Sequence, residues 1–156
     1  MEEVMRSFNE EKVRYLLIGG QAMRLSGMPR FSMDWDVYIP PKDDVNLEKI
    51  NGVLRDEIDL PVEAVGKRGE NFIQTYQTRW GVIQFHLGGP GLPAFEEAEK
   101  RGVERIDVGG TRIKCMSEQD LLASKEAAGR DQDMIDAEFL RRKIGGRADP
   151  RLRAGG

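Results

Sequence analysis

Residues 15–39, with the sequence YLLIGGQAMRLSGMPRFSMDWDVYI, constrain the fold more than any other stretch of the chain. Residues 15–18 are apolar with no alternating polar positions, which predicts a short strand buried on both faces. The pair Gly19-Gly20 follows, and residues 21–26 have the composition of a short helix. Residues 33–39 predict a second strand, which a proline pair ends. The stretch therefore predicts a strand, a glycine turn, a helix and a second strand in close succession.

The acids of this second strand are Asp34 and Asp36, spaced two apart. Side chains alternate along a strand, so both carboxylates are expected to point to one face. Two such carboxylates repel each other unless a cation lies between them, and hard oxygen ligands favour Mg²⁺ shared with phosphates. The Gly19-Gly20 turn lets backbone N–H groups approach an anion. We interpret the pattern as a site for a metal-bound nucleotide; the alternative is an exposed sheet face with two solvated acids.

The remaining sequence predicts an α+β domain with one mixed, twisted β-sheet and flanking helices. Periodicity and turn residues predict helices over residues 2–10, 43–57, 95–100, 117–128 and 131–143, and hairpins over residues 72–87 and 103–115. Residues 1–144 are expected to form this single domain. Residues 145–156 have almost no apolar content, so we expect a disordered tail.

Composition excludes several classes of protein. The 24 basic and 27 acidic residues give a net charge of −3, so contact with nucleic acid requires a local basic patch. Basic residues between Arg141 and Arg153 keep a nucleic-acid-binding role open as an alternative. The single cysteine, Cys115, excludes a disulfide within the chain and is expected to be a small buried residue. With no signal-peptide pattern and no apolar stretch of about 18 residues, we expect a cytoplasmic protein without a membrane span.

Two groups of residues resemble the DNA-polymerase-β-like nucleotidyltransferases. The first group is Gly19, Gly20, Ala22, Gly27, Pro29, Arg30, Ser32, Asp34 and Asp36, and the second is Ser117, Asp120, Leu121, Lys125, Ala127, Gly129, Arg130, Asp133 and Asp136. More narrowly, the chain is similar to the minimal bacterial and archaeal branch that includes abortive-infection-type toxins of toxin–antitoxin systems. The resemblance covers roughly residues 12–140, and it is specific for the superfamily rather than for a substrate.

The resemblance implies transfer of a nucleoside monophosphate from an NTP to an acceptor hydroxyl, with release of pyrophosphate. Two divalent ions, Mg²⁺ or Mn²⁺, would clamp the attacking and leaving oxygens. Asp34 and Asp36 would ligate both ions, and the Gly19-Gly20 turn would hold the β- and γ-phosphates, with Ser32 beside it. The acceptor would be RNA such as tRNA, a protein or a small molecule, and a toxin would bring an antitoxin partner.

Basic residues are expected on the triphosphate as well. The resemblance implies that Lys125 neutralises its charge from one side, that Arg30 does so from the other, and that Arg130 contributes to the same phosphate site. Asp133 and Asp136 are expected to structure the start of the last helix and to pair with Arg130 rather than to bind metal.

The sequence departs from the family pattern at the third carboxylate, which binds the catalytic metal and helps to deprotonate the acceptor. The matching strand reads GVIQFHL and carries no acid, so Gln84 or His86 takes that place. A glutamine carbonyl can ligate a metal but cannot take a proton, whereas histidine can take one but suits softer ions. The alternative for His86 is a strand residue with a satisfied hydrogen bond. The departure leaves two hypotheses open: an active nucleotidyltransferase with altered ligands, or an inactive fold that binds nucleotides or proteins.

Overall fold

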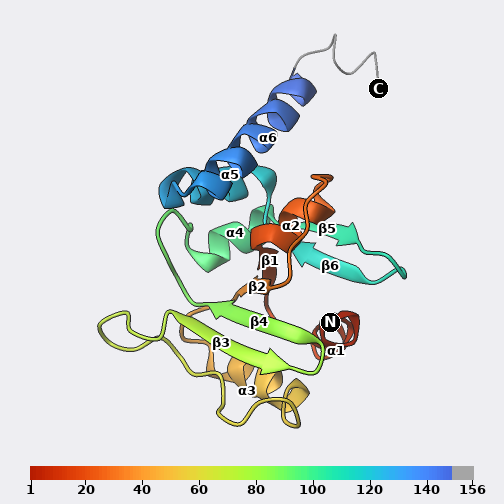
Figure 1. Ribbon diagram of the computed structural model, residues 1–156. Helices are drawn as coiled ribbons and strands as arrows, with labels where there is room; N and C mark the ends of the chain where they lie inside the picture. Colours follow the sequence, from red (N-terminus) through yellow and green to blue (C-terminus); the bar gives the residue numbers. More distant parts are fainter. Residues whose placement is uncertain (149–156) are drawn as a thin grey trace.

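The computed structural model describes residues 1–148 and consists of six helices and six strands within that range (Figure 1). In chain order the elements are α1 (Glu2–Glu10), β1 (Leu16–Ile18), α2 (Gly19–Leu25), β2 (Trp35–Tyr38), α3 (Asp44–Val53), β3 (Ile73–Thr78), β4 (Gly81–His86), α4 (Phe95–Arg101), β5 (Val103–Ile106), β6 (Arg112–Cys115), α5 (Glu118–Ala128) and α6 (Asp131–Ala148). The predicted α+β class, both hairpins and every predicted helix are confirmed.

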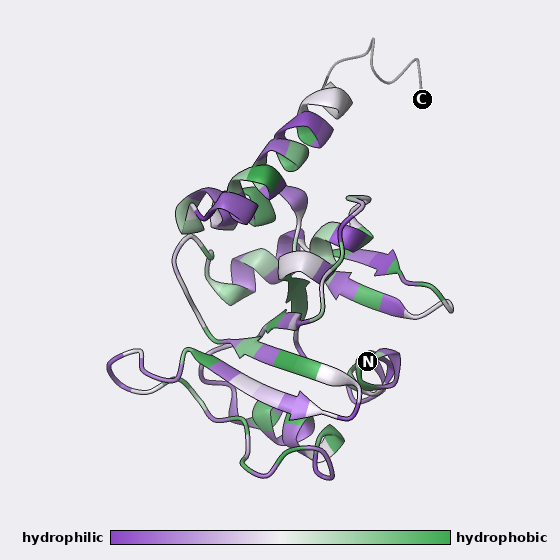
Figure 2. Ribbon diagram, viewed as in Figure 1, coloured by the Kyte–Doolittle hydropathy of each residue, from purple (hydrophilic) through white to green (hydrophobic). Residues whose placement is uncertain are grey.

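The six strands form one mixed sheet in the order β3-β4-β2-β1-β6-β5. The two hairpins, β3–β4 and β5–β6, are antiparallel and form the two edges. The central strands pair β2 with β4 and β1 with β6 in parallel, while β1 and β2 run antiparallel. All three residues of β1 are buried, as predicted, because strands and helices surround it; it is also strongly hydrophobic in Figure 2.

Different helices cover the two faces of the sheet. Phe8 of α1 packs its ring 6.5 Å from that of Phe85 on β4, and α3 lies beside α1. On the opposite face, the Tyr38 ring of β2 meets Phe95 of α4 edge-on at 5.2 Å. The hairpin β3–β4 extends beyond α4. The residues of β4 alternate between buried and partly exposed, and those of β3 alternate between partly exposed and exposed. The colour of the hairpin also alternates in Figure 2. One face of this hairpin is therefore open.

Side-chain caps fix the starts of two helices. The Asp43 carboxylate accepts a hydrogen bond from the Asn46 backbone at the start of α3, and the Ser117 hydroxyl accepts one from Asp120 at the start of α5. Gly129, in the left-handed conformation with φ of +66°, ends α5. The starts of these two helices near residues 43 and 117, and the end of α5 at residue 128, agree with the helix ranges predicted from the sequence.

Several boundaries differ from the prediction. Helix α3 ends at Val53, four residues before the predicted end at residue 57. Strand β2 begins at Trp35, where its pairing with Ile83 of β4 begins, so Asp34 lies in the preceding bend rather than inside the strand. Helix α6 continues beyond residue 143 to Ala148. Lys143 anchors this part of the helix by pairing with Glu118 at 3.1 Å and by donating to the Ser26 carbonyl. The predicted domain boundary at residue 144 falls inside α6, and the rest of the predicted tail, residues 149–156, lies outside the described residues.

Two further expectations concern Cys115 and the membrane. The Cys115 side chain is 1% exposed, as predicted for a small buried residue, and burial raises the pKa of its thiol to about 12. Among residues 1–148, no helix has the length and apolar character needed to cross a membrane.

The buried ring of Phe85 gives a test of this core. Phe85→Ala is expected to lower the free energy of unfolding by about 3–5 kcal/mol, because it leaves a cavity between β4, α1 and β3. Val108→Ala, at a side chain that is 84% exposed, should change the stability by less than about 0.5 kcal/mol. Urea denaturation measures both values, and equal effects of the two substitutions would contradict this packing.

Candidate functional site

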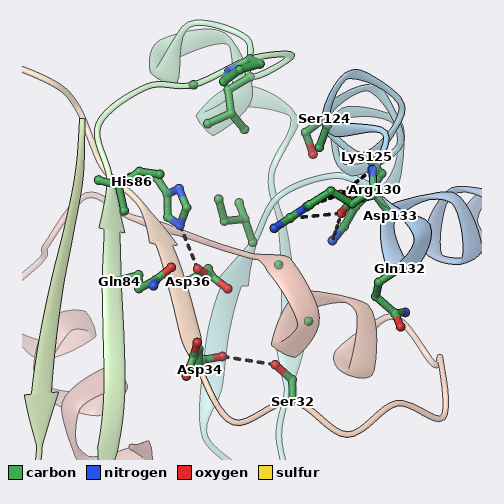
Figure 3. A pocket seen from close by; sticks show the side chains of 18 of the residues that line it. Ser32, Asp34, Asp36, Gln84, His86, Ser124, Lys125, Arg130, Gln132 and Asp133 are labelled. Atoms are coloured by element: carbon green, nitrogen blue, oxygen red, sulfur yellow. Dashed lines mark hydrogen bonds and ion pairs between the residues drawn. The ribbon is translucent and has the colours of Figure 1, made fainter. Parts of the chain in front are cut away.

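A pocket of about 870 Å³ lies where the open face of the β3–β4 hairpin meets α5 and the start of α6. The structure brings all ten residues proposed from the sequence to its wall, and Figure 3 shows most of them. They are Gly19, Gly20, Arg30, Ser32, Asp34, Asp36, Gln84, His86, Lys125 and Arg130. The pocket therefore joins segments from both halves of the chain.

The glycine turn is packed directly against two of these side chains. Gly19 has a positive φ of +68°, and a Cβ there would lie 2.4 Å from Oδ2 of Asp36. A Cβ on Gly20 would lie 2.5 Å from Oγ of Ser32. A larger residue at either position would clash, because neither neighbour is the far end of a long side chain. The two glycines thus let a carboxylate and a hydroxyl approach the backbone of the turn.

The two acids differ in their surroundings. The Asp36 side chain is 19% exposed, and its Oδ1 lies 2.8 Å from Nε2 of His86. Asp34 is exposed, and its backbone carbonyl accepts a hydrogen bond from Ser32 Oγ at 3.4 Å. Within residues 1–148, no group of three or more His, Cys, Asp or Glu side chains is arranged to hold a metal ion. Asp34 and Asp36 remain the predicted metal donors, and the described residues place no third carboxylate beside them.

Gln84 and His86 project from the same face of β4, as their spacing predicted. The parallel register with β2 places Gln84 directly opposite Asp36, and His86 opposite Tyr38. His86 nevertheless reaches Asp36 through its side chain (Figure 3). An ionised carboxylate can only accept hydrogen bonds, so Nε2 carries the hydrogen in this contact, and Nδ1 is the acceptor nitrogen when the ring holds one hydrogen. Gln84 is thus the residue paired with Asp36 in the sheet, while His86 makes the side-chain contact with Asp36.

The three basic residues belong to one network of ion pairs. Lys125 Nζ lies 2.9 Å from Asp136 and 3.4 Å from Asp133, and Arg30 Nη1 lies 2.9 Å from Asp136. Arg130 Nε lies 2.7 Å from Asp133. Asp136 is fully buried, and the Lys125 side chain is 11% exposed. The cations that line the pocket are therefore held in place by carboxylates from α6.

The expected pairing of the last two acids is correct for Asp133 and wrong for Asp136. Asp133 also accepts the backbone N–H of Arg130, as a third-position acid does at a helix start. Asp136 lies nearly one turn further along α6 and pairs with Arg30 and Lys125 instead. Burial opposes ionisation of Asp133, yet the Arg130 hydrogen bond and the Lys125 charge hold the pKa of this carboxyl below its usual value.

The sequence reasoning missed the apolar part of the pocket. Ile73 pairs with His86 across the hairpin, so both side chains emerge on the open face. Phe72, Met33 and Leu92 also line this side. The pairing of the predicted hairpin could have indicated Ile73, whereas Met33 and Leu92 come from loops that carry no comparable signal. The pocket thus has a charged wall and an uncharged wall.

Several solved structures have a similar arrangement of elements. A proposed nucleotidyltransferase of Thermotoga maritima superposes with a TM-score of 0.60 at 14% identity, over 91% of this chain and 88% of that one. ANT(2'')-Ia, solved in complex with adenylyl-2''-tobramycin, gives a TM-score of 0.60 at 13% identity, over 98% and 92%. The lincosamide antibiotic adenylyltransferase LnuA, with lincomycin bound, gives 0.58 at 19% identity, over 86% and 89%.

Comparison with protein-family models gives no match, and comparison with curated protein sequences gives none either. At identities this low, the structural similarity concerns the fold and not the substrate. The similarity shows the fold alone, and the predicted superfamily stays a prediction. The chain has the nucleotidyltransferase fold.

Proposed function

We propose that the protein is a cytoplasmic nucleotidyltransferase that transfers a nucleoside monophosphate from an NTP to an acceptor hydroxyl. One observation carries this proposal: a single pocket combines the Gly19-Gly20 turn, the carboxylates of Asp34 and Asp36, and a wall of basic side chains. Each part suits a different portion of a metal-bound triphosphate. A fold used by nucleotidyltransferases adds support but does not specify the reaction.

The basic wall is suited to bind the triphosphate. Arg30, Lys125 and Arg130 carry three positive charges, and their partners Asp133 and Asp136 carry two negative charges. One positive charge remains, and the ion pairs hold the side chains before any ligand arrives. Such preorganised charges stabilise phosphate without reorganisation. The glycine turn and the Ser32 hydroxyl lie next to this wall and complete the phosphate site.

Asp34 and Asp36 would hold a divalent cation, Mg²⁺ or Mn²⁺. Their donor set of carboxylate oxygens suits a hard ion that keeps its remaining positions for water and substrate phosphates. When bound, such an ion would neutralise charge on the phosphates and polarise the reacting phosphorus.

The remaining residues act on the acceptor. In the transfer, a bond forms between the acceptor oxygen and the α-phosphorus, the bond from this phosphorus to the β-phosphate oxygen breaks, and pyrophosphate leaves with that electron pair. The proton of the hydroxyl must go to a base. His86 can accept it at Nδ1, because Nε2 is bonded to Asp36. Gln84 can orient the acceptor through its amide.

The chemistry of the uncharged wall favours a small-molecule acceptor over RNA or protein. Phe72, Ile73 and Met33 offer apolar contact, and no lining residue from β3, β4 or the loop after them is an Asp, Glu, Lys or Arg. Two of the similar solved structures contain an antibiotic or an adenylylated antibiotic. The role of a toxin with an antitoxin partner, which the sequence resemblance implies, places the acceptor instead on RNA such as tRNA or on a protein.

A second candidate function is a nucleotide-binding module without transfer activity. The specific observation in its favour is the replacement of the third acid: Gln84 lies opposite Asp36, and His86 occupies one Asp36 oxygen. Under this alternative Arg30, Lys125 and Arg130 still bind the phosphates, but no group completes the metal site. Binding and transfer therefore need separate measurements.

Nucleotide binding can be measured by thermal unfolding with each NTP and Mg²⁺. At a concentration 100 times the Kd, an NTP should stabilise the protein by about 2.7 kcal/mol, and each kcal/mol raises Tm by roughly 2–4 °C in a domain of this size. Gly20→Ala should lose this shift, because its Cβ displaces Ser32 from the turn. Gly52→Ala is the matched control, since a Cβ there meets nothing within 4 Å, and it should keep the shift. Absence of a shift with every NTP would refute the nucleotide site.

Transfer can be measured with α-labelled NTP, Mg²⁺ or Mn²⁺, and pools of small metabolites, RNA and protein as acceptors. The wild-type protein should transfer label, and Asp34→Ala should reduce the rate by about 10²–10³-fold, the loss typical of removing one preorganised charge at a reacting phosphate. Asp59→Asn, at an exposed acid outside the pocket, should leave the rate unchanged. Nucleotide binding without transfer to any pool would favour the binding module.

A further inference from the structure

The Asp36 carboxylate has unequal oxygens. Oδ1 lies 2.8 Å from Nε2 of His86, while Oδ2 faces the backbone of Gly19 in the glycine turn. Within residues 1–148, no hydrogen bond or ion pair to Oδ2 is found. Asp36 therefore offers one oxygen toward the phosphate side of the pocket, and the N–H of His86 takes the other.

Strand β4, which pairs with β2 beside Asp36, carries no acid that replaces the missing third carboxylate. Gln84 lies directly opposite in the parallel register, and its amide is neutral. A bridge between two metal ions requires a carboxylate with both oxygens available, and usually a further acid on the catalytic ion. In the part of the chain that the structure describes, no third acid joins Asp34 and Asp36.

We infer that the site takes one divalent cation instead of two, and that His86 excludes the second ion by replacing a carboxylate and occupying Oδ1 of Asp36. The single ion would be shared by Asp34, Oδ2 of Asp36 and the nucleotide phosphates. This inference rests on the proposed function, since the nucleotide supplies the remaining ligands. His86 is thus the residue that sets the metal content of the site.

The test counts Mn²⁺ per bound nucleotide by electron paramagnetic resonance. The probe is the α,β-methylene analogue of the NTP that stabilises the protein most, with the protein in excess, and equilibrium dialysis of the same samples measures the bound analogue. The wild-type protein should bind one Mn²⁺ per nucleotide. His86→Asp should bind two, with the broadened spectrum of a spin-coupled pair about 3.5–4 Å apart.

Two variants serve as controls. His86→Asn, which removes the ring without adding charge, should bind one Mn²⁺ per nucleotide. Gln77→Asp should do the same, because it adds an acid to the same face of the hairpin four residue pairs away from His86, opposite Val82. Circular dichroism checks that each variant is folded, and His86→Glu, which also replaces the ring with a carboxylate, takes the place of His86→Asp if that variant is not.

The outcomes separate the inference from the proposed function. Two ions per nucleotide in the wild-type protein would overturn the inference while supporting nucleotide binding. A single ion in a folded His86→Asp variant would overturn the role of His86, as would a second ion in His86→Asn or Gln77→Asp. Failure of the wild-type protein to bind the α,β-methylene analogue of any NTP would refute the proposed nucleotide site, and the inference with it.

Discussion

The buried carboxylate of Asp136 holds together the parts of the chain that form the pocket. It is fully buried and binds Lys125 of α5 and Arg30 of the loop between α2 and β2. A buried charge is tolerated when it is paired, and removal of a partner typically costs about 3–5 kcal/mol. The position of α6 therefore depends on one cation from α5 and one from the loop before β2. Because those cations also line the pocket, folding and the geometry of the pocket depend on the same contacts.

The open face of the β3–β4 hairpin gives the pocket its second wall. Ile83 and Phe85 are buried on one face of β4, where α1 packs, so the alternation of the strand leaves Gln84 and His86 on the other. Since α4 covers that face only near Tyr38, these two side chains line a cavity instead of a core. A ligand in this position meets an uncharged sheet on one side and the basic wall on the other.

The sequence predicted the elements well because their signals are local. The caps at Asp43 and Ser117 and the glycine that ends α5 each act within a few residues. Contacts between distant segments could not be predicted in the same way. The His86–Asp36 bond depends on a parallel register between strands 50 residues apart, and Asp136 finds Arg30 across 106 residues. The motifs predicted the charged and polar lining of the pocket, but not its apolar lining or these two long-range contacts.

Under the proposed function, the phosphate-binding residues and the replaced third acid would act on different steps. The glycine turn and the Arg30, Lys125 and Arg130 side chains would contact a triphosphate whether or not it reacts. The Asp36–His86 pair would instead border the place where the acceptor hydroxyl loses its proton. A substitution at His86 would therefore alter metal content and proton transfer, but leave the ion pairs of α6 intact. Nucleotide affinity would then depend on the glycine turn and the three basic side chains, and turnover on β2 and β4.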